Sequence, residues 1–442
     1  MPTQEVAPAA RHAALVRRGR DRPHRVLLDG DGDAWGDGTV RYSDTPAATL
    51  TCYASGWSAW REAGATRWRW GDPFAAWQAF VDAQRPALGD GGGIATALAY
   101  DLKHAGERLA RRLPWPTTPL LFAAAYDWSY RADVRRGRAW IAARDAERLA
   151  RGLAWFAAPD APLTPPRRPL YPRPLLDRET YGALVARVQA YIAAGDVYQV
   201  NLAQPFHAAA ARTDAAALLA AWTERYPMPY AAYLDGGDWT LVSNSPECLL
   251  RVDGEHIATL PIKGTRRAGG GVAGGLAADA KERAEHVMIV DLERNDLGRV
   301  CVAGSVAVSD LFAEHAFPLL VHMVSEVHGR LRPHTSLAAV LRALFPGGSI
   351  TGAPKIRAME IIEELEPAPR GFYTGAVGWT EPDGRSVFNI AIRTAVLDAA
   401  GLCYWAGGGI VADSQAAREY AETLLKTEAL VHALRGLERT GA

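Results

Sequence analysis

The chain contains 442 residues, of which 49% are hydrophobic and 22% charged, and its 49 Lys and Arg residues equal its 49 Asp and Glu residues. This length is enough for two or three domain equivalents, or for one large domain with an appendage. The charge balance gives no preference for a polyanion, so a nucleic-acid partner is not expected.

The sequence favours a cytoplasmic protein. No apolar run approaches the roughly 20 residues that span a membrane. The basic N-terminal segment is not followed by the apolar core of a signal peptide. The four cysteines lie far apart and show no metal-ligand spacing. Reduced thiols are therefore the default expectation, although the sequence alone leaves disulfides open.

The first region, residues 1–155, is rich in tryptophan. Five of these side chains are expected to be core aromatics: Trp57, Trp60, Trp68, Trp70 and Trp77. The glycine run at 89–93 is interpreted as a turn rather than a phosphate loop, because no Lys-Ser/Thr pair follows it. Prolines then cluster in residues 156–176, a composition typical of extended chain. The main boundary of the chain is placed in this connector.

The third region, residues 177–436, begins with a helix signal. Asp177 can cap a helix in which Tyr181, Val188 and Ile192 recur at helical spacing. Strands are predicted at 197–202, 230–234, 239–243 and 248–252, and Asp253-Gly254 indicates a hairpin. Further strands at 371–379, 387–397 and 402–411 alternate with helices, and a last helix is predicted at about 415–436.

Two glutamate pairs could bind a metal ion. Glu282 and Glu285 lie on a predicted helix, and Glu419 and Glu422 lie on the last one. Spacing of three residues places each pair on one helix face, where the like charges repel modestly. A hard cation such as Mg²⁺ would remove that conflict. Each pair taken alone is more typical of a solvated face, and Lys426 is compatible with an ordinary i, i+4 partner of Glu422.

A single lysine stands at the end of an apolar run in Leu260–Thr265. Pro261 stiffens the backbone before Lys263, and Gly264 removes a side chain after it. From local chemistry alone, the segment is most simply a strand end with a solvated lysine. The alternative is a buried amine that attacks a substrate.

Several other residues are candidates for a chemical role only if a ligand or other site residues lie beside them. Alternation along the predicted strand puts Arg393 on the face opposite to Phe388, Ile390 and Ile392. If other parts of the protein cover that face, the guanidinium needs an anion as partner. The glycines at 347–352 and at 407–409 could bring backbone N–H groups to an anion, although either run could be a turn. Glu247 and His322 are candidates for proton transfer only if a substrate lies beside them.

These features occur together and in order with further short motifs. The set comprises Tyr198–Leu202, Ser245-Pro246-Glu247, Pro261–Thr265, Glu285-His286, Val290-Asp291-Leu292, Arg294-Asn295-Asp296, His322–Ser325, Gly348–Lys355, Gly408–Ser414 and Glu419 to Lys426. Over about Asp177 to Val431 the chain closely resembles the chorismate-utilising enzymes. That family includes the first components of anthranilate synthase and aminodeoxychorismate synthase, and the isochorismate and salicylate synthases.

Within the family, three positions narrow the resemblance. Lys263 is similar to the lysine of the aminodeoxychorismate synthases, where anthranilate synthases carry alanine. Gln199 stands where the isochorismate and salicylate synthases carry a water-activating lysine, so hydroxylation is disfavoured. Leu27-Leu28-Asp29-Gly30 differs from the Leu-Leu-Glu-Ser segment of tryptophan-regulated anthranilate synthases, so tryptophan feedback is not expected.

The resemblance implies a set of site residues. Mg²⁺ would be held by Glu285 and Glu422, with Glu282 and Glu419 beside them, and would anchor the ring carboxylate of chorismate. The other substrate-binding residues would be Thr265, Thr351, Arg393, Gly407, Gly408, Gly409 and Lys426. Lys263 would add at C2 as the C4 hydroxyl leaves, with Glu247 as proton donor and His322 as a further catalytic residue. Ammonia would then add at C4 and expel Lys263.

The resemblance also implies a fold and a partner. The expected fold is α+β, with two large, mostly antiparallel sheets packed as a sandwich and flanked by helices, and residues 1–155 sharing that core. No cysteine lies in the setting of an amidotransferase nucleophile, so a separate glutamine amidotransferase subunit is expected to supply ammonia for 4-aminobenzoate and folate synthesis. Anthranilate synthase component I is the nearest alternative, and a non-catalytic chorismate-binding partner subunit is an alternative of another class.

Overall fold

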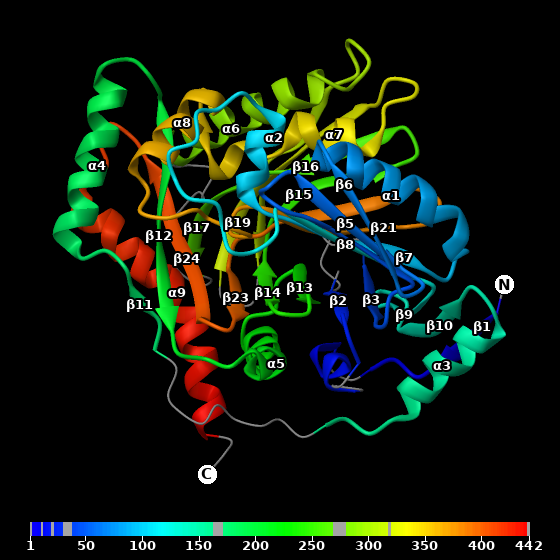
Figure 1. The fold of residues 1–442 in the computed structure, drawn as a ribbon. Coiled ribbons are helices and arrows are strands. Elements are labelled where there is room, and N and C mark those ends of the chain that lie inside the picture. The colour runs from blue at the N-terminus through cyan, green and yellow to red at the C-terminus, as the bar shows by residue number, and fades with distance from the viewer. Residues whose placement is uncertain are drawn as a thin grey trace.

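A computed structural model describes residues 2–9, 12–18, 22–29, 38–161, 171–267, 280–316 and 320–439. Within these residues the chain forms two twelve-stranded sheets, and every strand pairing is antiparallel. Figure 1 shows the two sheets with helices on their outer sides. The predicted α+β sandwich is confirmed.

The first sheet combines strands from both ends of the chain. Its order is β1 (Thr3–Val6), β10 (Arg138–Ala143), β9 (Trp128–Asp133), β3 (Thr39–Ser43), β2 (Val26–Asp29), β13 (Tyr230–Asp235), β14 (Thr240–Ser245), β23 (Thr394–Asp398), β24 (Gly401–Ile410), β12 (Gln199–Ala208) and β11 (Arg173–Pro174), with β20 (Gly352–Ala353) beside β12.

The second sheet is built in the same mixed way. Its order is β17 (Ile262–Arg267), β19 (Leu320–Arg330), β16 (His256–Leu260), β15 (Cys248–Asp253), β22 (Ser386–Ile390), β21 (Ala376–Thr380), β7 (Gly93–Leu98), β8 (Leu121–Tyr126), β4 (Ala48–Cys52), β5 (Trp57–Glu62) and β6 (Ala65–Trp70), with β18 (Ala307–Ala316) beside β19.

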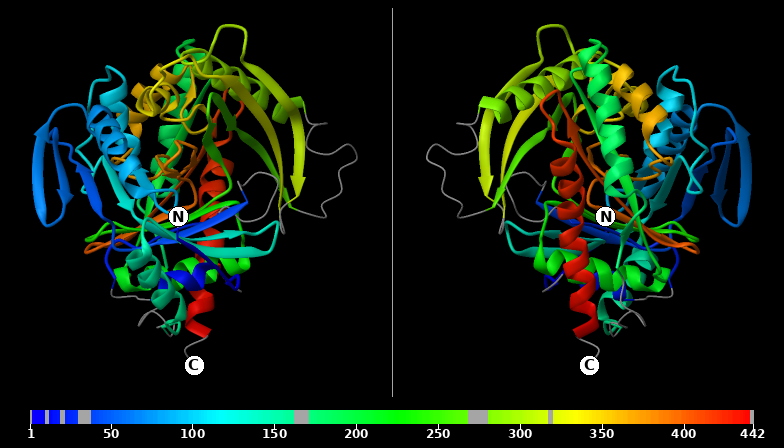
Figure 2. Two further views of the ribbon diagram at one scale, coloured as in Figure 1. Left: turned by 90° about the vertical axis from the view of Figure 1, so that its right-hand side faces the viewer. Right: turned by 90° about the vertical axis from the view of Figure 1, so that its left-hand side faces the viewer.

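Helices cover the outer faces of the sheets. The α-helices are α1 (Pro73–Leu88), α2 (Lys103–Gly106), α3 (Ala146–Ala157), α4 (Arg178–Ala193), α5 (Ala215–Arg225), α6 (Ala280–Gly298), α7 (Leu337–Leu344), α8 (Lys355–Leu365) and α9 (Ala416–Arg439). The 3-10 turns are η1 (His12–Arg17), η2 (Tyr100–Leu102), η3 (Arg212–Asp214) and η5 (Gly348–Ile350). Figure 2 shows the long α9 running down to the C-terminal end.

The layers follow from the two-residue period of the strands. On β7, Ile94 and Leu98 pack toward α1, whereas Ala95 and Ala97 face the other sheet. Leu28 on β2 faces back into the same inter-sheet core. The small alanine side chains let the sheets approach closely, and each sheet has a second apolar face for helices because alternate residues point to opposite sides.

Most predicted elements of residues 177–436 are present, although β12 extends to Ala208 rather than Leu202 and β21 begins at Ala376 rather than Gly371. Asp177 caps α4, and its Oδ1 accepts a hydrogen bond of 2.8 Å from the Thr180 amide. The predicted hairpin joins β15 to β16, with Asp253 opposite His256 and Gly254 at a φ of 59°. The turn is therefore Gly254-Glu255, one residue later than predicted.

The predicted strand at 387–397 is wrong in one respect. The segment forms two strands, β22 in the second sheet and β23 in the first. The chain passes between the sheets at 391–393, where Arg393 has a φ of 48°. Both halves are rich in apolar and β-branched residues, including Val387-Phe388 and Ala395-Val396-Leu397, so each is typical of a strand and the sequence contains no sign of the change of sheet.

The prediction that all five N-terminal tryptophans are core residues is also wrong. Trp77 is fully buried and Trp60 half-buried, but Trp57, Trp68 and Trp70 are 46%, 54% and 72% exposed. Their hairpin, β5–β6, forms the edge of the second sheet, and all six residues of β6 are exposed. Alternation identifies a strand face but not whether a second layer covers it.

Three expectations from the sequence concern the chain as a whole. In the proline-rich connector predicted at 156–176, residues 162–170 lie outside the described residues, α3 ends at Ala157, and Arg173–Pro174 form β11. All four cysteines are free thiols. In the described part of the chain, no helix combines the length and apolar character needed to cross a bilayer.

Replacing a buried tryptophan should cost much more stability than replacing an exposed one. Trp155 is fully buried, stacks on Tyr42 at 4.2 Å and donates from Nε1 to the Arg18 carbonyl. Trp155→Ala is expected to lower the free energy of unfolding by about 3–5 kcal/mol. The exposed Trp70 provides the control, and Trp70→Ala should change it by less than about 0.5 kcal/mol. Urea denaturation measures both, and equal losses would contradict the assignment of the two layers.

Candidate active site

Lys263 lies on β17, where the second sheet faces the loop that contains η5. Lys263 is half-buried, and its Nζ donates to the Ser349 carbonyl at 3.4 Å. The amide side chain of Asn201, on β12 of the first sheet, donates to the same carbonyl at 2.7 Å. The Ser349 carbonyl therefore connects Lys263 of the second sheet to Asn201 of the first.

Glu247 is placed beside this lysine by the start of β15. It is 4% exposed, and its backbone N–H donates to the Ser245 hydroxyl at 3.1 Å. Burial raises the pKa of Glu247, while the Ser349 hydroxyl, the Lys263 ammonium and the Ile262 amide lower that pKa in part. Its Oε1 has no hydrogen-bond partner among the described residues. A buried acid of raised pKa with a spare oxygen is suited to proton donation.

The pKa of Lys263 is shifted in the direction that an amine nucleophile needs. Burial lowers the pKa of Lys263, and the Lys426 ammonium lowers it further. The carboxylates of Glu247, Glu285 and Glu422 raise that pKa in part. Glu247 lies directly before β15, Glu285 on α6, and Glu422 and Lys426 on α9, so segments distant in the sequence act on one amine.

Two glutamates of the last helix, Glu419 and Glu422, face Gly408 of the first sheet. A Cβ added to Gly408 would lie 3.4 Å from Glu419 Oε2 and 3.5 Å from Glu422 Oε1. Lys426 Nζ lies 2.6 Å from Glu422 Oε1 and donates to the Gly407 carbonyl at 2.7 Å. The predicted contact of Lys426 with Glu422 is present, and the same ammonium binds two oxygens, one from Glu422 and one from Gly407.

The donor set fits a hard cation in its chemistry. Glu285 and Glu422 both act on Lys263, Glu282 precedes Glu285 by three residues on α6, and Glu419 precedes Glu422 by three residues on α9. Among the described residues, however, no group of three or more His, Cys, Asp or Glu side chains is close enough to hold a metal ion. All four carboxylates lie on two helices that flank the lysine, but they are not gathered to coordination distance.

His322 and Arg393 form another part of the site. His322 is opposite Thr265 in the β17–β19 pairing, and its Nδ1 is 3.1 Å from the Gly264 carbonyl. Burial and the charge of Arg393 lower the pKa of His322 to about 4. The structure describes the backbone of Thr265 but not its side chain.

Arg393 offers its guanidinium without an acidic partner. Its Nη1 is 3.5 Å from the Met228 sulfur, and no described carboxylate lies within ion-pair distance of it. Burial lowers the pKa of Arg393. A half-buried guanidinium of this kind is suited to an anionic ligand.

The remaining predicted residues help to shape the site. The Thr351 hydroxyl donates to the carbonyls of Gly347 and Gly348, at 3.0 and 3.2 Å, so its proton is used within the turn. A Cβ on Gly409 would meet Gln199 at 2.9 Å, and one on Gly407 would meet the Leu202 carbonyl at 2.3 Å. Gly408 alone of these three glycines faces the glutamates of α9.

Sequence reasoning did not single out Glu293 or Ser349. Ser349 contacts Lys263 by its carbonyl, and Glu293 accepts from the Gly348 amide at 3.0 Å. The sequence does contain a signal for Glu293, since it lies between Ile289 and Leu297 at spacings of four residues, and both are fully buried. An acid in the middle of an apolar helix stripe indicates a specific partner.

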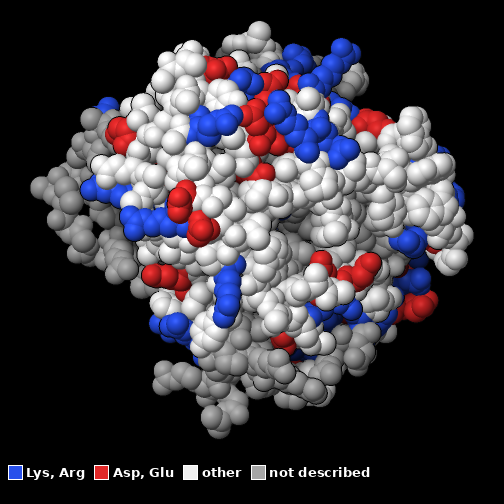
Figure 3. Space-filling model, turned by 60° about the vertical axis from the view of Figure 1, so that its left-hand side comes forward, with Lys and Arg blue, Asp and Glu red and all other residues white. Residues whose placement is uncertain are grey.

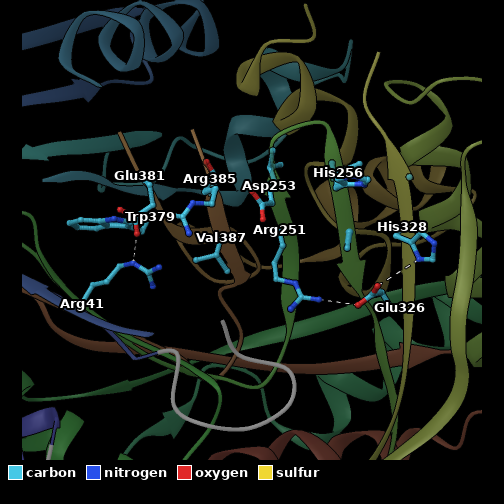
Figure 4. Close-up of a pocket in the computed structure, with 15 residues that line it drawn as sticks. Arg41, Arg251, Asp253, His256, Glu326, His328, Trp379, Glu381, Arg385 and Val387 are labelled. Atoms are coloured by element: carbon cyan, nitrogen blue, oxygen red, sulfur yellow. Dashed lines mark hydrogen bonds and ion pairs between the residues drawn. The ribbon is translucent and has the colours of Figure 1, made fainter. Parts of the chain in front are cut away.

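A separate polar cavity of about 460 Å³ lies across β15, β16, β19, β21 and β22. Figure 4 shows two ion pairs in it, Arg41 with Glu381 and Arg251 with Glu326. None of the predicted site residues lines it. On the face that Figure 3 brings forward, basic and acidic side chains are interspersed.

Comparisons with known proteins identify the family of the chain. Residues 25–432 match the family described as chorismate binding enzyme. The chain is 39% identical over 360 residues to aminodeoxychorismate synthase component 1 of Salmonella typhimurium, covering 79% of this chain and 78% of that protein. It is 48% identical over 263 residues to anthranilate synthase component 1 1 of Haloarcula marismortui, covering 58% and 54%.

A solved structure gives the same result for the fold. The crystal structure of anthranilate synthase component I from Streptococcus pneumoniae matches with a TM-score of 0.77 and 28% identity, covering 90% of this chain and 93% of that one. The matches to several curated relatives span only 54–58% of those proteins' lengths. Relatives with two different names thus resemble the chain to a similar degree.

The lowered pKa of Lys263 can be measured directly. The Lys263 amine should be acetylated by acetic anhydride at lower pH than the same residue in the urea-denatured chain, because burial favours the neutral amine. Since the Glu247 carboxylate raises the pKa of Lys263, Glu247→Gln should move this titration to still lower pH. Peptide mass spectrometry measures the extent of acetylation. Titration at the same pH in native and denatured chains would contradict the site.

Proposed function

The chain belongs to the family of chorismate-binding enzymes, and from this premise we propose that it converts chorismate and ammonia to 4-amino-4-deoxychorismate. The observation that carries the proposal is Lys263, a half-buried lysine whose pKa is lowered by burial, with the buried acid Glu247 close enough to influence that pKa. A neutral amine is needed for nucleophilic attack, and an acid that still holds its proton is needed for a hydroxide leaving group.

In the proposed reaction the amine of Lys263 bonds to C2 of chorismate while the C4–OH bond breaks. Glu247 gives its proton to the departing hydroxyl, which leaves as water. Ammonia then bonds to C4, and the electron pair of the C2–N bond returns to Lys263. Covalent catalysis in this form divides one difficult substitution into two easier ones.

The other residues would bind the substrate's charged groups. Arg393 has no described carboxylate partner and would receive an anionic group near the enolpyruvyl side chain. Lys426 and the backbone around Gly408 would lie at the ring carboxylate. The carboxylates of Glu285 and Glu422, with Glu282 and Glu419, would hold Mg²⁺. When bound, the cation would neutralise the ring carboxylate and stabilise charge at the leaving oxygen.

Two partners complete the proposal. A separate glutamine amidotransferase subunit would supply ammonia, and another enzyme would convert the product to 4-aminobenzoate for folate synthesis. The names of relatives such as those from Salmonella typhimurium and Escherichia coli support this member of the family. The alternative product, anthranilate, is favoured by the similarity to anthranilate synthases of Haloarcula marismortui and Pseudomonas putida.

Product identification tests the reaction. Wild-type protein given chorismate, Mg²⁺ and ammonium should form 4-amino-4-deoxychorismate, identified by mass and absorbance before and after addition of a lyase. Chorismate and Mg²⁺ without ammonium should leave a covalent adduct on the peptide containing Lys263. Glu247→Gln should lower kcat by about 10²–10⁴-fold, the usual contribution of a general acid. Anthranilate as the product, or an adduct that survives Lys263→Ala, would contradict the proposal.

The metal requirement has its own test. Glu285→Gln and Glu422→Gln should each raise the Mg²⁺ concentration for half-maximal turnover by about 10–100-fold, because each removes a charged ligand. Glu428→Gln, an exposed residue on the same helix as Glu422, is the matched control. Thermal stabilisation by Mg²⁺ alone gives a reading without turnover. Full activity after exhaustive chelation would contradict a role for the ion.

A further inference from the structure

The turn at 347–351 contacts one of the groups that are proposed to react and influences the other. The Ser349 carbonyl accepts from Lys263 Nζ at 3.4 Å, and the Ser349 hydroxyl lowers the pKa of Glu247. A shift of this turn would therefore move the amine and the acid together. Displacement of reacting groups by about 1 Å can reduce a rate by about 100-fold.

Glu293 of α6 supports this turn from behind. Its Oε1 accepts a hydrogen bond of 3.0 Å from the Gly348 amide, and it is 1% exposed. A Cβ on Gly348 would lie 2.6 Å from Leu292 and 3.1 Å from Glu293 Oε1. The glycine thus allows the backbone to approach α6 directly, and the carboxyl group receives the amide that would otherwise be buried without a partner.

Other groups hold the ends of the turn. Lys355 of α8 donates to the Pro346 carbonyl at 2.9 Å and forms an ion pair with Asp296 of α6. The Thr351 hydroxyl closes the turn on itself. Glu293 is the described side chain that joins the centre of the turn to α6.

The surroundings of Glu293 disfavour a negative charge. No described cation lies within ion-pair distance of Glu293. Lys355, whose charge acts on Glu293, forms its ion pair with Asp296 instead. The Oε2 of Glu293 is buried without a partner among the described residues. Burial raises the pKa of Glu293 to about 8, with Asp296 and Glu247 adding to the increase and Lys355 and the Gly348 amide opposing it.

We propose that Glu293 is a positioning residue which, as a neutral carboxylic acid, holds the 347–351 turn against Lys263 and Glu247. A neutral acid accepts from the Gly348 amide without drawing Lys355 away from Asp296. An ionised Glu293 would compete with Asp296 for that ammonium, which also anchors Pro346 at the start of the turn. Glu293 acts through the turn and does not touch the substrate.

The sign of its contribution to stability follows from the raised pKa. Between the ordinary value of 4.5 and about 8, folded Glu293 keeps a proton that the unfolded chain has lost. The folded state therefore binds more protons there, and this group makes the protein less stable as pH rises. Glutamine imitates the neutral acid at every pH and removes this dependence.

The experiment compares Glu293→Gln and Glu293→Leu with the wild type, and Asp291→Asn, an exposed carboxylate on the same helix, is the matched control. Glu293→Gln keeps an oxygen for the Gly348 amide and should retain kcat within about threefold near pH 7. Glu293→Leu lacks that oxygen and should lower kcat by about 10–100-fold. The KM for chorismate should stay within about twofold, because substrate contacts are kept.

Melting temperature between pH 5 and 8 gives a reading that needs no turnover. The advantage of Glu293→Gln over the wild type should grow across this range, whereas Asp291→Asn should follow the wild type. Acetylation of Lys263 gives a second such reading, because only Glu293→Leu should change its pH dependence. Both measurements remain decisive if chorismate is not turned over, and the melting-temperature comparison of Glu293→Gln with the wild type also serves if Glu293→Leu does not fold.

The proposal rests on Lys263 and Glu247 as the reacting groups, and its failure is distinct from theirs. Chorismate turnover that Glu293→Leu leaves intact would overturn the positioning role while the proposed reaction stands. Loss of kcat in Glu293→Gln as large as in Glu293→Leu would exclude the neutral acid. A melting-temperature difference that is constant from pH 5 to 8 would do the same.

Discussion

The passage of the chain between the two sheets is the constraint on which the site depends. At 391–393 three residues separate β22 of one sheet from β23 of the other, so the sheets cannot slide past each other. The loop at 345–353 makes a second connection, since it reaches Lys263 on one side and Asn201 on the other. Alanines such as Ala95 and Ala97 keep the sheets close elsewhere. The groups around Lys263 therefore have fixed positions although they come from elements far apart in the sequence.

Burial shifts the pKa values of Lys263 and Glu247 in opposite directions, and both shifts suit the proposed reaction. It lowers the pKa of Lys263 and raises the pKa of Glu247, because a low-dielectric setting disfavours charge of either sign. Both shifts favour the uncharged forms, an amine that can attack and an acid that can give up a proton. At their ordinary pKa values, near neutral pH, the same pair would be an ammonium and a carboxylate, with neither nucleophile nor proton donor available. The fold produces both shifts through desolvation and needs no unusual residue type.

The sequence predicted what depends on local rules and on recognisable motifs. The cap at Asp177 and the hairpin after β15 follow from side-chain chemistry and turn geometry within a few residues. The break at Arg393 and the exposure of Trp68 could not be predicted, because each depends on which layer covers a strand rather than on the strand itself. Lys263 and Glu247 were identified through motifs. Glu293 was missed because its partner, the Gly348 amide, is 55 residues away and has no side chain to suggest a contact.

The exposed edge strand β6 has a consequence for how the protein behaves in concentrated solution. Its free backbone groups and its tryptophans, Trp68 and Trp70, would invite another copy to pair along the edge. Two copies related by a twofold axis across that edge must place residues of the same face opposite each other. Arg67 and Arg69 would then meet the arginines of the other copy. Like-charge repulsion between these arginines would disfavour such pairing, while Arg67 also forms an ion pair with Glu62 of the neighbouring β5.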